Sequence, residues 1–284
     1  MNDYLRRLTA AVDRELLEGI RPQNGTLEAA MHYALSVSGK RLRPLLFLTL
    51  LDASGMEAQR YIGLASALEI IHTYSLIHDD LPVMDNDDLR RGMPTVHKKF
   101  NEALALLAGD TLLTFAFEKI AAAPLPAEKT VAIMGIITRC IGKEGMAQGQ
   151  ALDLEFSGNA ETIADIHRLK TAELIKGALL AAAEVADFDT QRRQLLARAG
   201  IALGLGFQLA DDLLDITGAE SQVGKRLNKD QANRSPNAVL YFGVPAVREK
   251  IDACYREAGG LIGELQIEFP PFLLLMKSML YRSQ

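Results

Sequence analysis

Two aspartate-rich segments carry the residues of this sequence that could do chemistry. Residues 79–85 read DDLPVMD, and residues 208–215 read QLADDLLD. Each segment ends a long apolar stretch, where clustered carboxylates repel one another and ionised groups need compensation. One such cluster could equally be a solvated helix end, but two of them favour a single site between facing helices. The all-oxygen donor set predicts Mg²⁺ bound together with substrate phosphates.

The second segment reads as one face of a helix. Asp211 and Asp215 are four residues apart, which places them one turn apart on the same face. Gln208 lies one turn earlier on that face, and Asp212 lies beside it.

The first segment is interrupted by Pro82, which disfavours helix at the preceding residue and has no N–H to donate. We therefore expect the helix to end or bulge here, so that Asp85 turns back toward Asp79. His72 lies about two helical turns before Asp79 and either faces the same cleft or packs as a core histidine.

Basic residues accompany both acidic segments. Residues 38–44, SGKRLRP, place three cations at the start of an apolar helix, whose first-turn N–H groups also favour an anion. Arg90 and Arg91 follow the first aspartates directly, and Lys170-Thr171 and Lys225 lie further along. Each could be an ordinary surface charge, and one of the two arginines could simply neutralise the aspartates. Because neither the spacing nor a preceding strand matches a nucleotide P-loop, the pattern predicts a diphosphate site.

Composition excludes several other classes of protein. The chain has 284 residues, 49% of them hydrophobic, and a formal net charge of −5, which argues against a nucleic-acid partner. Cys140 and Cys254 match no metal or disulfide spacing and predict buried thiols in a reducing compartment. We see no apolar signal-peptide core and no apolar run long enough to span a membrane. These features predict a cytoplasmic protein without membrane insertion.

Helical periodicity dominates the whole chain, and strand signals are scarce. The pattern predicts one all-α domain over residues 1–284, with residues 218–237 forming a polar lid rather than a linker. The expected helices are 3–19, 26–37, 40–53, 57–81, 99–122, 127–156, 160–185, 189–217, 244–266 and 270–281.

Taken together, these motifs resemble the trans-prenyltransferases, the isoprenyl diphosphate synthases, almost from end to end. LIHDDLPVMDNDDLRRGMPTVH resembles the first aspartate-rich motif of that family, and FQLADDLLD resembles the second. GKRLRP at 39–44, GQALDLE at 149–155 and LKTAELI at 169–175 are also similar to family sequences. Four residues separate Asp80 from Asp85, as in the longer first motif of bacterial farnesyl diphosphate synthases and plant-type geranylgeranyl diphosphate synthases.

The resemblance implies an all-α helical bundle around a deep central cavity, usually as a homodimer. It implies Mg²⁺-dependent, head-to-tail condensation of isopentenyl diphosphate with an allylic diphosphate, with three Mg²⁺ per site. The implied metal ligands are Asp79, Asp80, Asp85, Asp211, Asp212 and Asp215. The implied allylic contacts are Arg90, Lys170, Thr171, Gln208 and Lys225, and the implied isopentenyl contacts are Lys40, Arg43, His72 and Arg91. Among these, Asp79, Asp85, Lys170, Asp211 and Lys225 are the implied catalytic residues.

Product length is inferred from Tyr74, five residues before Asp79. A ring there could form the floor of the chain-elongation cavity, as in farnesyl diphosphate synthases, although it could also be core packing. We expect a C15 product, with geranylgeranyl or geranyl diphosphate as alternatives. Residues 233–238, NRSPNA, depart from the family, which has a lysine, a hydroxyl residue and Tyr-Pro here; Arg234 would replace the lysine, and Asn228 stands where glycine is common.

Three rival functions are less consistent with the sequence. A class I terpene cyclase would carry Glu where this chain has Ala219. A squalene-type synthase would add a membrane anchor, and none is evident. A regulatory subunit of a heteromeric prenyltransferase would normally have lost one aspartate motif, whereas both are present here.

Overall fold

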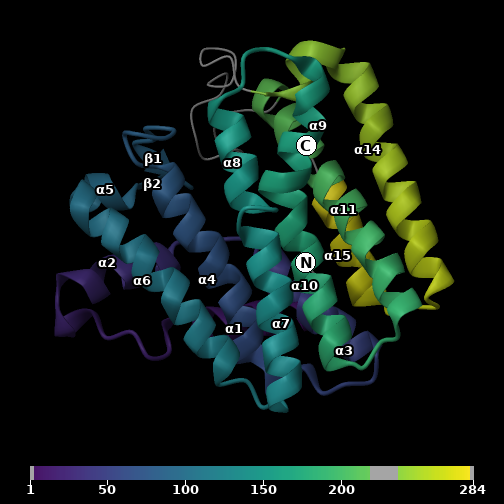
Figure 1. The fold of residues 1–284 in the computed structure, drawn as a ribbon, viewed down its shortest axis with the longest axis horizontal. Coiled ribbons are helices and arrows are strands. Elements are labelled where there is room, and N and C mark those ends of the chain that lie inside the picture. Colours follow the sequence, from purple (N-terminus) through teal and green to yellow (C-terminus); the bar gives the residue numbers. More distant parts are fainter. Residues whose placement is uncertain (1–2, 218–235, 282–284) are drawn as a thin grey trace. The chain divides into compact units, whose positions relative to one another are not determined.

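The computed structural model describes residues 3–217 and 236–281 (Figure 1). Most of these residues are helical and the strands are two residues long, so the all-α prediction is confirmed. The chain folds as two compact units, Met1–Leu48 with Ala58–Pro126, and Thr49–Glu57 with Ala127–Gln284. The single domain over 1–284 stays a prediction. None of the described helices is long and apolar enough to cross a membrane.

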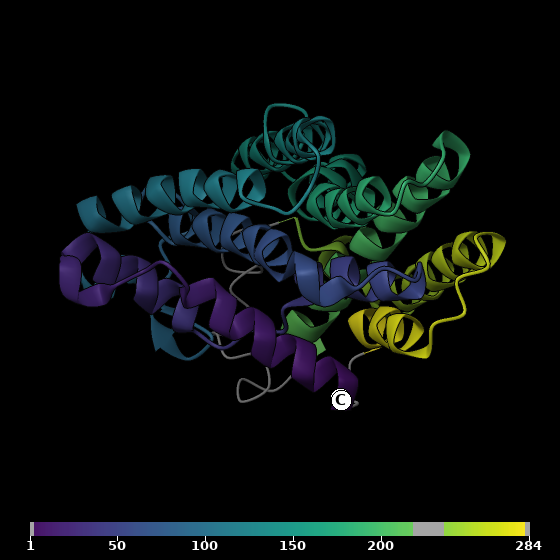
Figure 2. The same cartoon turned by 90° about the horizontal axis from the view of Figure 1, so that it is seen from below.

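The first unit is built around α4, Ile62–Asp79, which carries buried residues on more than one face. This distribution is typical of a helix inside a bundle. Figure 2 shows α4 between α1 and α6, and both helices contact it. The elements of this unit are α1 (Asp3–Leu17), η1 (Pro22–Asn24), α2 (Thr26–Ser36), the first part of α3 (Leu42–Ala53), η2 (Ala58–Tyr61), α4, β1 (Leu89–Arg90), β2 (Met93–Pro94), α5 (Val96–Lys99) and α6 (Glu102–Ala121).

A short hairpin, β1–β2, follows the first aspartate segment and was not predicted. Arg90 pairs with Met93, and the two residues between them, Arg91 and Gly92, have φ of 53° and 78°. Two positive φ values define the type I′ turn that suits a two-residue hairpin. Arg91 therefore occupies a left-handed conformation that non-glycine residues seldom adopt, as is common at functional sites.

The second unit packs around α11, Thr190–Thr217, which contacts α10, α14 and α15. Its buried residues are mostly small and apolar, so neighbouring helices approach it closely. The elements are α7 (Ala127–Ile141), α8 (Met146–Leu154), η3 (Ala160–Thr162), α9 (Ile163–His167), η4 (Arg168–Ala172), α10 (Glu173–Val185), α11, α14 (Ala238–Glu264) and α15 (Pro270–Leu280).

The structure differs from the prediction most clearly in two helical segments. The expected helix 127–156 ends at Ile141 and resumes at Met146, because Gly145 has a non-helical backbone and packs so closely on Cys140 that a Cβ would overlap the carbonyl of Cys140. The helix expected at 244–266 matches the part of α14 that follows Gly243, but α14 also has an earlier segment, which was not predicted and begins at Ala238. The Asn237 carboxamide caps it by accepting from the Val239 N–H at 2.9 Å, and the helix then kinks at Gly243, whose φ is 77°.

Candidate active site

The first aspartate segment folds back on itself at the end of α4. The Asp85 N–H donates to the Asp79 carbonyl at 2.8 Å, and the Asp87 N–H donates to the Asp80 carbonyl at 3.2 Å. The prediction that the chain turns at Pro82 and returns Asp85 to Asp79 is confirmed. Two acidic residues that are six positions apart in sequence thus become neighbours.

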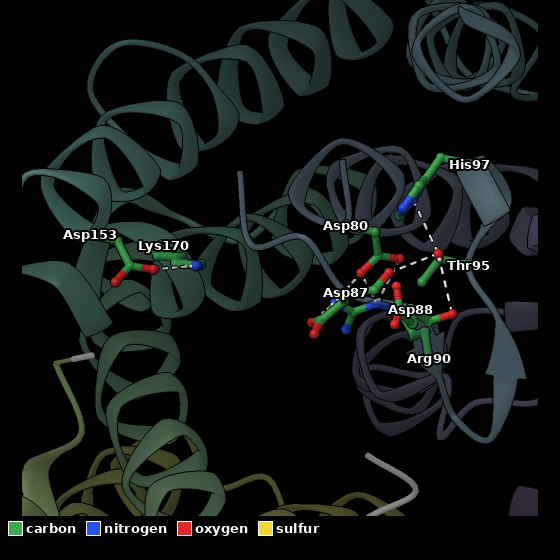
Figure 3. Close-up of polar contacts among 8 residues, drawn as sticks. All are labelled: Asp80, Asp87, Asp88, Arg90, Thr95, His97, Asp153 and Lys170. Atoms are coloured by element: carbon green, nitrogen blue, oxygen red, sulfur yellow. Dashed lines mark hydrogen bonds and ion pairs between the residues drawn. The ribbon is translucent and has the colours of Figure 1, made fainter. Parts of the chain in front are cut away.

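Asp80 lies behind this turn and is only 3% exposed. The Arg90 Nε lies 2.8 and 3.0 Å from its two oxygens, and Nη2 lies 2.5 Å from Oδ1 (Figure 3). Burial raises the pKa of Asp80, against the lowering effect of the Arg90 hydrogen bonds. Burial likewise opposes the charge on Arg90, but its bonds to Asp80 prevail and raise the pKa of Arg90. Arg90 therefore neutralises an aspartate, which is the role the sequence left open for one of the two arginines.

The hairpin itself is held by Thr95. Its N–H donates to the Asp88 carbonyl at 3.0 Å, and its hydroxyl donates to the Asp87 carbonyl at 2.8 Å. The His97 Nδ1 lies 3.1 Å from the same hydroxyl (Figure 3). These contacts fix the position of Arg90 and Arg91 relative to the aspartates that precede them.

Arg91 reaches from the hairpin to the basic loop at 38–43. Its Nη1 donates to the Ser38 carbonyl at 3.1 Å, and a Cβ at Gly39 would overlap its guanidinium. Burial lowers the pKa of His72 well below its usual range, and nearby Arg43 and Arg91 lower it further. The structure therefore brings together His72, Arg43 and Arg91 in a cationic environment, whereas Lys40 is exposed at the edge of the loop.

Arg41, between these residues, was missed as a site residue. Its side chain is buried and donates to Asp13 at 2.7 Å and to Glu69 at 3.1 Å. It also donates to the Leu35 and Val37 carbonyls, and its own φ is 48°. The signal that could have revealed it is Glu69, an acid in the middle of the apolar helix α4, which needs a buried partner.

In the second unit, α11 is helical through the whole second aspartate segment, so Asp211 and Asp215 lie one turn apart as predicted. Gln208 is held between two neighbours. Its Oε1 accepts from the Thr171 hydroxyl at 2.9 Å, and its Nε2 donates to Asp212 Oδ1 at 3.1 Å. The structure thus joins Thr171, Gln208 and Asp212 in one chain of hydrogen bonds.

Lys170 and Thr171 lie in η4, a π-helical turn, and such turns recur at functional sites. The turn is pressed between two helices, because a Cβ at Gly149 of α8 would overlap the Lys170 backbone and a Cβ at Gly204 of α11 would overlap Ala172. The Lys170 ammonium pairs with Asp153 of α8 (Figure 3). Asp153 was also missed, although it lies in the family-like GQALDLE segment.

Tyr74 lies on α4, half-buried, with its ring edge-on to that of His78 at a centroid distance of 5.9 Å. Burial, with a smaller effect from Asp79, raises the pKa of Tyr74 to about 12, so the phenol is neutral. Lys225, Asn228, Arg234 and most of the predicted lid 218–237 lie outside the described residues.

The described residues contain no group of three or more His, Cys, Asp or Glu able to hold a metal ion by themselves. The donor set nevertheless fits Mg²⁺ that arrives with a diphosphate. Asp79 and Asp85 are neighbours across a backbone hydrogen bond, and Asp211 and Asp215 are one helical turn apart. One or two carboxylates completed by phosphate oxygens is the usual environment of this ion.

Comparison with known proteins points the same way. Residues 24–262 match the polyprenyl synthetase family. The chain is 40% identical over 259 residues to farnesyl diphosphate synthase of Geobacillus stearothermophilus, covering 88% of this chain and 86% of that protein. It is 38% identical over 263 residues to the chloroplastic geranylgeranyl pyrophosphate synthase of Catharanthus roseus, covering 90% of this chain and 74% of that protein.

A solved structure agrees with these sequence matches. The geranyltransferase of Helicobacter pylori, complexed with magnesium and isoprenyl diphosphate, aligns with a TM-score of 0.84 at 32% identity, over 98% of this chain and 95% of that one. Both the sequence matches and the structural match extend over most of the chain, and the chain belongs to the polyprenyl synthetase family.

Proposed function

We propose that this prenyltransferase condenses isopentenyl diphosphate with dimethylallyl and then geranyl diphosphate to give trans-farnesyl diphosphate. Farnesyl diphosphate synthases from several bacteria, each about 40% identical to this chain, support this reaction. The structural observation that carries the proposal is the turn that returns Asp85 to Asp79 beside the arginine hairpin. This arrangement of paired carboxylates next to cationic side chains supports the proposal of a magnesium diphosphate site.

In this proposal Asp79 and Asp85 hold Mg²⁺ on the allylic diphosphate, and Asp211 and Asp215 supply further ligands. When bound, Mg²⁺ would supply positive charge against the negative charge that develops on the leaving diphosphate. Lys170, Thr171 and Gln208 bind and orient the allylic substrate, together with Arg90. Lys225 is proposed for the same substrate from its position in the motif alone.

Arg43, Arg91, His72 and Lys40 bind isopentenyl diphosphate. Because the pKa of His72 is lowered, the ring is neutral at pH 7 and contributes a hydrogen bond rather than a charge. The two arginines supply the positive charge and suit the geometry of phosphate. Arg41 does not contact substrate in this proposal; its bonds to Asp13 and Glu69 hold the loop that carries Arg43.

The proposed reaction needs no reactant other than its two diphosphate substrates. The allylic C–O bond breaks, and its electron pair leaves with the diphosphate. The double bond of isopentenyl diphosphate then attacks the allylic cation and forms the new C–C bond. A proton is lost from the adjacent carbon to the released diphosphate, which restores a double bond, and the growing chain remains attached to the second diphosphate.

Three finer features complete the proposal. Tyr74 limits the product to fifteen carbons by occupying the path of the growing tail. Three Mg²⁺ ions bind in each active site, as the family resemblance implies. The protein is a homodimer in the cytoplasm, again by analogy with the family. Magnesium use is supported by the Helicobacter pylori geranyltransferase, which was solved with magnesium and isoprenyl diphosphate.

The test is to incubate the purified chain with labelled isopentenyl diphosphate, geranyl diphosphate and Mg²⁺, and to size the dephosphorylated products by chromatography. We expect a C15 alcohol that disappears when Mg²⁺ is chelated and is lost in Asp79→Asn. A magnesium-dependent C20 or C10 product would keep the reaction and overturn the chain length. If no allylic diphosphate gives a product, the proposed prenyltransferase activity is wrong, and the chain is instead a regulatory subunit of a heteromeric prenyltransferase.

A further inference from the structure

The two aspartate pairs, Asp79-Asp80 and Asp211-Asp212, share an unexpected asymmetry. The first residue of each pair is half-buried, whereas Asp80 and Asp212 are only 3% and 4% exposed. Asp80 is bound by Arg90, which lies in strand β1 of the hairpin that follows. Asp212 is bound by a different set of groups, the Gln208 carboxamide and the Ala238 N–H.

Both carboxylate oxygens of Asp212 accept hydrogen bonds from the protein. Oδ1 accepts from Gln208 Nε2 at 3.1 Å. Oδ2 accepts from the Ala238 N–H at 2.7 Å and lies 3.4 Å from the Nε2 of His167. The Asp212 carbonyl also accepts from the Asn237 carboxamide at 3.2 Å. One aspartate thus ties α11 to α9 and to the first turn of α14.

His167 is 5% exposed and belongs to no motif considered so far. Its Nε2 lies 3.1 Å from the Pro236 carbonyl as well as 3.4 Å from Asp212 Oδ2. Both neighbours are acceptors, so Nε2 must carry a proton, which it donates to the Pro236 carbonyl. The histidine therefore holds the backbone at Pro236, where the described chain resumes before α14, and its ring lies beside the Asp212 carboxylate.

We infer that Asp212 and His167 are positioning residues of the second aspartate motif rather than a metal ligand and a bystander. The Asp212 carboxylate holds the start of α14 against α11, and His167, beside that carboxylate, holds the Pro236 carbonyl that precedes α14. Because α11 is then fixed relative to α14, the carboxylate of the adjacent Asp211 is held in one orientation. This inference rests on the proposed function, because it concerns how the same magnesium site is supported.

Substitution by asparagine separates the two roles of Asp212. Asp212→Asn removes the charge but keeps an acceptor for Ala238 and His167, while its amide nitrogen can donate to Gln208. The Gln208 amide turns over to accept it, and the Thr171 hydroxyl can accept in turn. A metal ligand loses its function with its charge, whereas an anchor keeps most of it. Asp212→Leu, by contrast, leaves buried donors without an acceptor.

We therefore expect Asp212→Asn to keep kcat/KM within about tenfold of the parent enzyme and to leave the half-saturating Mg²⁺ concentration unchanged. Asp211→Asn should lose on the order of a hundredfold or more and raise that concentration. If Asp212→Asn instead matches Asp211→Asn in both measurements, Asp212 is a ligand and the inference fails.

His167 is tested by a conservative pair. Glutamine can place its Nε2 donor near the position of the histidine Nε2, so His167→Gln should rescue most of the kcat that His167→Leu loses, on the order of tenfold or more. His32→Leu is the matched control, because His32 is half-buried on α2, where its Nδ1 lies 3.2 Å from the Ser36 hydroxyl of the same helix. Equal losses in His167→Gln and His167→Leu would refute a hydrogen-bonding role.

A readout without substrate keeps this inference distinct from the proposed function. Amide hydrogen exchange in residues 237–240 of the magnesium-free protein should accelerate at least tenfold in His167→Leu and Asp212→Leu, and little in His167→Gln, Asp212→Asn and His32→Leu. Unchanged exchange in the two leucine variants would overturn the anchor even if the enzyme is active. If exchange accelerates in the two leucine variants but the parent protein has no prenyltransferase activity, the anchor is supported and the proposed reaction is refuted.

Discussion

The proposed floor of the elongation cavity gives the sharpest test of product length. Tyr74 lies five residues before Asp79 on the uninterrupted helix α4. At about 1.5 Å per residue, the Cα of Tyr74 is roughly 7–8 Å further along the helix than the Cα of Asp79. A growing tail that follows α4 meets the ring at this depth. Tyr74→Ala removes the ring and should therefore shift the main product from C15 to C20 and longer.

The loss of stability in Tyr74→Ala depends on how much the ring contributes to packing in the fold. Tyr74 is half-buried and packs edge-on against His78, so its removal does not empty a closed core. Complete truncation of a buried aromatic costs about 3–5 kcal/mol, and we expect Tyr74→Ala to fall at or below the lower end. The variant should remain folded in a thermal melt, with a lowered midpoint. Its product distribution can then be interpreted.

The assay is the sizing of dephosphorylated products from geranyl diphosphate and labelled isopentenyl diphosphate. Tyr74→Phe is the matched control, because it keeps the ring and loses only the hydroxyl, and it should still make C15. If folded Tyr74→Ala also stops at C15, Tyr74 is core packing and another residue limits the chain. If Tyr74→Phe lengthens the product as much as Tyr74→Ala, the hydroxyl rather than the ring sets the length.

Three further predictions concern residues around the two motifs. Gly149→Ala places a Cβ into the backbone of η4, and we expect about 1–3 kcal/mol of destabilisation in urea unfolding together with a raised KM for the allylic substrate. The pKa of His72 is lowered on folding, so the unfolded chain binds a proton on this residue more readily than the folded chain does. The free energy of unfolding should therefore fall as the pH drops below about 6.5, and His72→Asn should weaken that pH dependence in thermal melts from pH 7.5 to 5. Arg90→Lys cannot contact both oxygens of Asp80, and kcat/KM should fall by about tenfold to a hundredfold in steady-state assays while Lys98→Arg, at an exposed pair, leaves it unchanged.

The helices could be predicted because their signals are local. Apolar periodicity marked α4, α6 and α11, and Pro82 correctly marked the turn in the first segment. The break at Gly145 and the early start of α14 could not be predicted from that periodicity, because they depend on tertiary contacts. Gly145 is required by close packing on Cys140, and α14 begins at Ala238 because Asp212, twenty-six residues away, accepts its first N–H.

The hairpin at 89–94 shows a second kind of limit. Two-residue strands carry no periodicity, and Arg91-Gly92 is a less obvious type I′ turn than Asn-Gly. The arginines were singled out for their charge, but their separation into different tasks follows from the hairpin. Arg90 turns inward to Asp80, and Arg91, in the turn, reaches Ser38. The backbone between them therefore decides which arginine neutralises an aspartate and which faces the basic loop.

The same reasoning explains why the aspartates could be located from the sequence but not assigned individual roles. Adjacent helix residues are about 100° apart around the axis, so Asp211 and Asp212 necessarily face different surroundings. Sequence spacing alone favours the Asp211-Asp215 face, but it does not say whether Asp212 meets solvent, metal or protein. Its 4% exposure and its bonds to Gln208 and Ala238 answer that question. A buried carboxylate must be matched by hydrogen-bond donors or by a metal ion wherever it occurs, and the donors around Asp212 belong to the protein. Of two adjacent aspartates on a helix, the more buried one is therefore the one whose hydrogen bonds the fold itself needs, and the more exposed one is better placed to bind a cation.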